Sequence, residues 1–179
     1  MMADCGVMRS LDSLPGRFGG KVDVAVLCNV LHEVRATRWR VELEKLLGCL
    51  AEDGALVICE DEQMTVGERP NELGYVVLGG GEIQTLFGLE KEPRMLRHPE
   101  ERYRERLLCV EVLKVGAKVT GESVRAAVSD LQGRLKGLVR GLVRELRTNP
   151  AGGDAKAGRM YGMWSQMLVN CWSSLEELG

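Results

Sequence analysis

The chain has 179 residues, of which 45% are hydrophobic and 28% charged, and its formal net charge is −2. This length suits one domain with its own core, and the near-neutral charge disfavours a dedicated nucleic-acid binder, whose surface carries a basic excess. No apolar run approaches the roughly 20 residues that a membrane helix needs, and the N-terminus lacks the apolar core of a signal peptide.

The first part of the chain predicts an irregular segment followed by a buried strand. Residues 1–20 are rich in glycine and contain a Leu-Pro and a Gly-Gly pair, which favour loop structure. Residues 22–30 form an apolar run that only Asp23 and Asn29 interrupt. Such a run is typical of a strand covered on both faces, as in a parallel sheet.

A helix and a second strand come next. Residues 37–50 place apolar side chains at helical spacing, and Gly54, just past the last of them, predicts the helix stop. Residues 55–59 predict another buried strand. Strand, crossover helix and strand together predict a right-handed parallel unit.

The middle of the chain is less regular. Residues 61–81 form a long polar segment, and loops of this length are usually functional or mobile. Within it, residues 75–78 are compatible with a short strand or with the apolar face of a lid. Residues 79–81 are three glycines, but they lack the spacing and the following lysine or hydroxyl residue of a phosphate-binding loop. Residues 82–89 predict a short helix.

The rest of the chain predicts a hairpin of strands and then a hairpin of helices. Residues 95–98 and 106–114 look like antiparallel strands joined by the charged turn 99–105. A helix that starts at the capping residues 120–123 ends before Pro150, and a second one runs from about 154 to 178. Their apolar stripes, which include Trp164 and Trp172, are interpreted as core or interface.

The basic residues of the first tail helix predict a solvated face, with a weak surface for an acidic partner as the alternative. Its near-heptad spacing also permits pairing of helices between chains.

The six cysteines contain no C-x-x-C pair, and Cys28, Cys59 and Cys109 lie in apolar runs where cysteine behaves as a small hydrophobe. We predict reduced cysteines in a cytoplasmic protein without a metal site; disulfides or zinc are the alternative.

The order of these elements resembles the second half of a class I S-adenosylmethionine-dependent methyltransferase. Asp23 to His32 matches D-V-x-x-x-x-x-V-L-H, a segment that ends the fourth strand of that family. Gly54 to Glu60 matches the glycine turn and the acid-ended fifth strand. Residues 95–114 match the edge hairpin of strands six and seven. The resemblance covers about residues 20–115.

The resemblance implies an α/β fold, a partial Rossmann-like methyltransferase sheet of strands four to seven followed by a C-terminal helical hairpin. The expected organisation is an irregular segment at 1–20, a methyltransferase-like half-domain at 21–115, and a helical hairpin at 116–179 that packs on this half-domain or on a partner.

The resemblance also implies site residues. In the small-molecule O-methyltransferases, the histidine of a comparable segment takes the proton of the acceptor hydroxyl, and an acid at the end of the next strand orients it. His32 would thus be the catalytic base and Glu60 the orienting acid, while Asn29 would face the methionine end of S-adenosylmethionine. Glu33 and Asp61, at the same strand ends, would contact the small-molecule acceptor.

Physical reasoning supports the base but leaves alternatives open. Imidazole has the unperturbed pKa closest to neutrality, which suits proton transfer. His32 could instead cap the strand end by bonding to backbone, with Glu33 solvated. Asn29 could be a core asparagine with satisfied hydrogen bonds. The acids at 60–62 could be solvated loop residues, and His98 is expected at the surface.

The cofactor half of the family fold has no counterpart in these 179 residues. It needs a glycine-rich loop after the first strand and an acid that ends the second strand and holds the ribose. We therefore expect either a truncated methyltransferase, inactive alone, or a degenerate relative. The alternative function is a non-catalytic interaction module that forms homo- or hetero-oligomers through its sheet edge or C-terminal helices.

Overall fold

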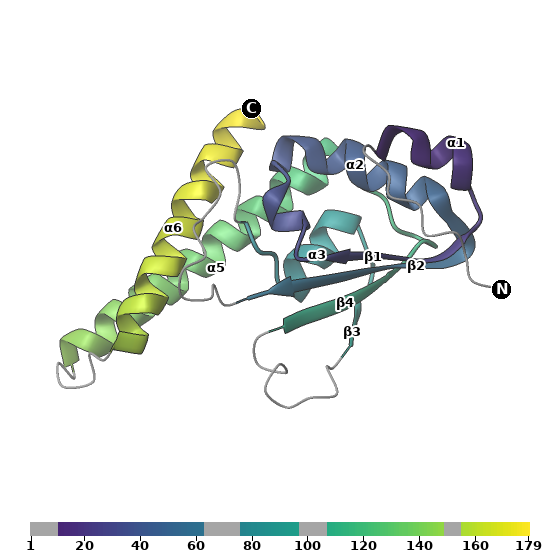
Figure 1. Ribbon diagram of the computed structural model, residues 1–179. Helices are drawn as coiled ribbons and strands as arrows, with labels where there is room; N and C mark the ends of the chain where they lie inside the picture. Colours follow the sequence, from purple (N-terminus) through teal and green to yellow (C-terminus); the bar gives the residue numbers. More distant parts are fainter. Residues whose placement is uncertain (1–10, 63–75, 97–106, 149–154) are drawn as a thin grey trace.

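The computed structural model describes residues 11–62, 76–96, 107–148 and 155–179, and the structural statements below refer to these residues. They form an α/β fold in which a four-stranded mixed sheet is followed by two C-terminal helices (Figure 1). The elements are η1 (Leu11–Ser13), α1 (Leu14–Phe18), β1 (Val22–Cys28), η2 (Leu31–Glu33), α2 (Ala36–Cys49), β2 (Leu50–Asp61), α3 (Gly80–Phe87), β3 (Arg94–Met95), β4 (Leu107–Leu113), α5 (Gly121–Thr148) and α6 (Ala155–Glu177). Among the described helices, none combines the length and apolarity that crossing a membrane requires.

The sheet has the strand order β1-β2-β4-β3. β1 and β2 are parallel and joined by α2, which confirms the predicted strand–helix–strand unit. β4 is antiparallel to both β2 and β3, so the predicted hairpin is present and its shorter strand lies at the sheet edge. The turn expected between those strands lies outside the described residues.

The predicted stop of α2 at Gly54 is wrong. The helix ends at Cys49, and β2 already begins at Leu50, whose side chain is fully buried and whose backbone is extended. Gly54 therefore lies within β2, near a register shift opposite Val22. A Cβ at Gly54 would come within 2.8 Å of the Val22 carbonyl oxygen, so this close approach of two strands requires glycine.

Three further expectations differ from the structure. Residues 11–18, expected to be irregular, form η1 and α1, where Pro15 lies in the first helical turn, which tolerates its missing N–H. β1 ends at Cys28 rather than residue 30. Of the two alternatives for residues 75–78, the short strand is absent at 76–78, where all three side chains are buried without regular structure; residue 75 lies outside the described residues.

One hydrophobic core joins the two parts of the chain. One face of β2 and β4 packs with α2, α3 and the first half of α5, and α6 adds Met167 and Cys171. The helical hairpin thus packs on the α/β half, with α5 and α6 side by side (Figure 1). The predicted apolar stripe of α6 is only partly core, because Trp164 is half-buried whereas Trp172 is 46% exposed.

The sheet is covered unequally on its two faces. Along β2 and β4, alternate side chains are buried against the helices, among them Ile58 and Val110. The other face is named here the open face; on β1 it leaves Val24 54% and Val26 60% exposed. The expectation that this first strand is covered on both faces is therefore wrong for the described residues. The open face comprises Val24, Val26, Cys28, Val57, Cys59 and Cys109.

Candidate functional site

The candidate site begins where β1 ends. Asn29 follows the strand with φ 52°, in the left-handed region, which asparagine tolerates better than most residues. Its N–H donates to the Cys59 carbonyl at 2.8 Å, and its Oδ1 accepts from the Asp61 N–H at 3.0 Å. Asn29 is thus an exposed link between two strand ends rather than a core residue within a strand.

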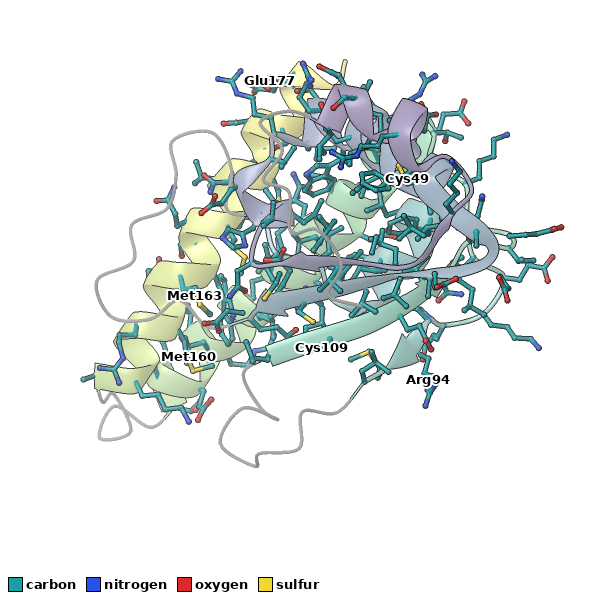
Figure 2. The ribbon with its side chains drawn as sticks, turned by 45° about the vertical axis from the view of Figure 1, so that its right-hand side comes forward. Cys49, Arg94, Cys109, Met160, Met163 and Glu177 are labelled. Carbon is teal, nitrogen blue, oxygen red and sulfur yellow. The ribbon has the colours of Figure 1, made fainter. Side chains whose placement is uncertain are left out.

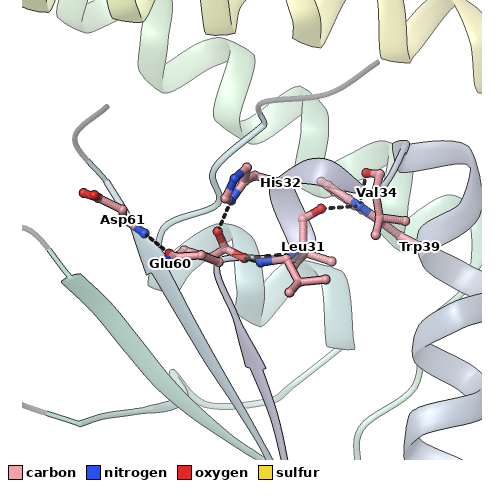
Figure 3. Close-up of polar contacts among 8 residues, drawn as sticks. Leu31, His32, Val34, Trp39, Glu60 and Asp61 are labelled. Carbon is pink, nitrogen blue, oxygen red and sulfur yellow. Dashed lines mark hydrogen bonds and ion pairs between the residues drawn. The ribbon is translucent and has the colours of Figure 1, made fainter. Parts of the chain in front are cut away.

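The turn η2 carries His32 across the end of β2. A buried tryptophan holds this turn in place: the Trp39 Nε1–H donates to the carbonyls of Leu31, at 3.2 Å, and Val34, at 2.8 Å (Figure 3). Because Trp39 is fully buried under the first turn of α2, the loop after β1 is fixed to the core by a helix that follows it in sequence.

Glu60 is the centre of the site, and only 2% of it is exposed. Its Oε1 accepts from the backbone N–H groups of Leu31, at 2.8 Å, and Val30, at 3.3 Å. Its Oε2 contacts Nδ1 of His32, which is 5% exposed (Figure 3). Two backbone donors therefore fix the carboxylate, and the carboxylate in turn fixes the imidazole.

This contact determines the tautomer of a neutral His32. A carboxylate only accepts hydrogen bonds, so Nδ1 carries the hydrogen that faces Glu60. The other ring nitrogen, Nε2, is then the atom at which the ring would take up a proton. At Nδ1 the partner of His32 is therefore a side-chain carboxylate and not a backbone group.

The structure brings some of the five predicted site residues into contact and leaves others apart. The structure joins His32 to Glu60 and joins Asn29 to the backbone of Asp61. Asp61 is buried, so solvated loop acids do not describe Glu60 or Asp61. Glu33 is exposed beside His32 in η2. His98 lies outside the described residues.

A second group of charged residues near these strand ends was missed. The buried Glu82 accepts from Arg134 Nε of α5 at 2.7 Å and from the Gly79 N–H at 2.8 Å. Burial raises the pKa of the Glu62 carboxyl; Arg134 opposes this, and the charges of Glu82 and Asp61 add to it. Arg134 therefore does not belong only to the solvated basic face of α5, because its guanidinium interacts with several acids.

Only part of this group had a signal in the sequence. An acid three residues after a helix-capping position is half of a capping box, and Gly79 to Glu82 has that spacing. Arg134 is 52 residues away from Glu82, so no local pattern indicates the contact.

The chemistry that the described residues support is proton transfer. No group of three or more His, Cys, Asp or Glu side chains in the described ranges could hold a metal ion. The arrangement instead provides one oriented imidazole and a fixed carboxylate behind it. Comparison with protein-family models, curated proteins and solved structures gives no match to this chain.

Proposed function

We propose that this chain forms the acceptor side of a class I S-adenosylmethionine-dependent methyltransferase, with His32 as the general base and Glu60 as the acid that orients it. The observation that supports this proposal is the buried contact between His32 and Glu60. It lies at the carboxyl ends of two adjacent parallel strands, the position where open α/β sheets gather their ligands.

In this proposal the side chains of the chain move one proton. An acceptor hydroxyl placed at Nε2 of His32 gives up its proton there, while Nδ1–H remains directed at Glu60. The carboxylate stabilises the imidazolium that forms, and the N–H groups of Leu31 and Val30 keep the carboxylate in position.

The residues of this chain fit the acceptor side but not the cofactor. The sequence has neither the G-x-G-x-x-G loop that follows the first strand of the family fold nor the ribose-binding acid that ends its second strand. In a doubly wound sheet of order 3-2-1-4-5-6, the fourth strand lies beside the first. β1, taken as the fourth strand, has no strand on its outer edge within the described residues. We propose that polypeptide outside these 179 residues contributes the glycine loop at this edge.

The test is a methyl-transfer assay on a longer product of the same gene, or on this chain co-produced with a polypeptide that has the glycine loop. Radiolabelled S-adenosylmethionine and a panel of small hydroxyl-bearing acceptors are supplied, and reactions without acceptor are the control. Acceptor-dependent labelling supports the proposal. A product that binds the cofactor but labels no hydroxyl acceptor contradicts it.

For the chain alone we expect no binding of S-adenosylmethionine at millimolar concentration. The physical reason is that neither the close backbone approach of a glycine loop nor a ribose-binding acid is present in the sequence. Isothermal titration calorimetry measures this directly. A saturable isotherm in the micromolar range would show that the described site binds the cofactor without the missing elements.

A second candidate function is a non-catalytic interaction module, and a separate observation favours it. β1 combines an outer edge that no described strand pairs with and valines that are more than half exposed. Unpaired edges of this kind pair readily with other chains. The coding sequence upstream of residue 1 discriminates the two: an in-frame strand followed by a glycine loop favours the methyltransferase, and a stop codon the module.

A further inference from the structure

Three cysteines form a row across the open face of the sheet. The strand registers pair Cys28 of β1 with Cys59 of β2, and Cys59 with Cys109 of β4. Residues at paired positions of adjacent strands direct their side chains to the same face. Cys28 is exposed and the other two are half-buried, unlike the buried Cys49, which lies apart from Cys109 at the end of α2 (Figure 2).

The backbone hydrogen bonds show which kind of pair Cys59 and Cys109 form. The Cys59 carbonyl accepts from Asn29 N–H on the β1 side, and the Cys109 carbonyl accepts from Leu96 N–H on the β3 side. Because the N–H and C=O of one strand residue face the same side, neither residue bonds the other. In such a non-hydrogen-bonded pair the Cα atoms lie about 4.5 Å apart, within the roughly 4.4–6.8 Å that disulfides span.

We propose that Cys59 and Cys109 form a reversible cross-strand disulfide when the chain meets a small disulfide oxidant of the glutathione class. The Cys109 thiolate attacks one sulfur of the oxidant, whose S–S bond breaks and releases one glutathione thiolate. The Cys59 thiolate then attacks the Cys109 sulfur and releases the second. The two protein thiols lose two electrons and two protons, and the oxidant becomes two thiols.

The surroundings of Cys59 support this order of attack. Burial, followed by the hydrogen bond with Cys109, raises the pKa of the Cys59 thiol to about 12; the charges of Cys109, Cys28 and Glu60 add to this. Cys59 therefore stays protonated at neutral pH and is the slower nucleophile. Burial, the largest of these causes, remains after Cys109 has taken up glutathione and keeps Cys59 mainly protonated at neutral pH. Its thiolate fraction therefore grows with pH, and ring closure should accelerate as pH rises.

The position of the pair makes the bond reversible and places it beside the candidate site. Both cysteines are only half-buried, so a reductant can reach the bond, and exposed bridges are among the readily reduced ones. Cys59 immediately precedes Glu60, and Cys109 follows Leu108, the register partner of Glu60. Oxidation would thus fix β2 to β4 next to the carboxylate that holds His32.

The test treats the C5S chain with oxidised glutathione and maps disulfides by mass spectrometry of non-reduced digests; C5S is the background because Cys5 lies outside the described residues. We expect a peptide that links Cys59 to Cys109 within one chain and disappears on reduction. The link should be lost in C59S and C109S and kept in the matched controls C28S and C49S.

Two measurements keep the proposal refutable if a variant misfolds. In the C5S chain with Cys59 and Cys109 both present, oxidation should block alkylation of these two cysteines together. Closure of the mixed disulfide should accelerate about tenfold from pH 7 to pH 8. Three outcomes would each overturn the proposal: intrachain disulfides that join Cys59 or Cys109 only to other cysteines, Cys59–Cys109 bridges found only between chains, or a mixed disulfide that never closes.

Discussion

Replacing His32 with alanine is expected to lower turnover by about 10²–10⁴-fold, the usual effect of removing a general base. The measurement is the turnover number of a methyl-transferring form that includes the cofactor loop. The loss follows from the geometry, because Glu60 holds the ring so that only Nε2 can take up a proton. Glu60→Gln should weaken the same step less severely, since the imidazole remains.

Two further variants separate catalysis from folding in this experiment. His32→Asn keeps an N–H donor toward Glu60 but has no basic nitrogen, so it should fold like the parent and turn over as slowly as His32→Ala. Arg35→Ala, an exposed change at the N-cap of α2 where the side chain makes no cap hydrogen bond, should leave turnover unchanged. Near-parental turnover of the folded His32→Asn variant would make His32 a structural residue.

Leu135→Ala is expected to lower the free energy of unfolding by about 2–5 kcal/mol, the range for buried leucines. Leu135 is 0% exposed in the core that joins α5 to the sheet. Urea unfolding followed by circular dichroism measures the effect. Leucine and alanine have similar helix propensities, so the loss reports packing rather than helix formation.

The matched control is Leu142→Ala, on the same helix two turns further along, where the side chain is only half-buried. Its loss should stay below about 1.5 kcal/mol because less apolar surface is returned to water. A loss below about 0.5 kcal/mol at Leu135 would show that α5 is not part of the common core.

The parallel unit of the sheet was predictable because its signals are local. The apolar run of β1 and the helical spacing of α2 depend only on neighbouring residues. The early start of β2 was not predictable, because Glu52 and Asp53 look like a helix end. A distant residue explains the extended conformation: the Lys114 N–H donates to the Gly54 carbonyl at 2.9 Å, across the sheet.

In the candidate site too, some contacts could be predicted from the sequence and others could not. The rule that polar residues collect at strand ends was sufficient to place His32 beside Glu60. It could not indicate that Arg134 reaches Glu82, which depends on how a later helix docks. The composition of β1 also suggested burial on both faces, whereas the described helices cover only one.

The outer edge of β1, which no strand among the described residues pairs with, affects the expected amide hydrogen exchange. The Asn29 N–H bonds to β2, and backbone groups alternate sides along a strand, so the amides of Ala25 and Leu27 also face β2. The amides of Val24 and Val26 face the outer edge. Protection should therefore alternate residue by residue, slow at odd positions and fast at even ones. A polypeptide that pairs with this edge would abolish the alternation, which makes these two valine amides direct reporters of a bound strand.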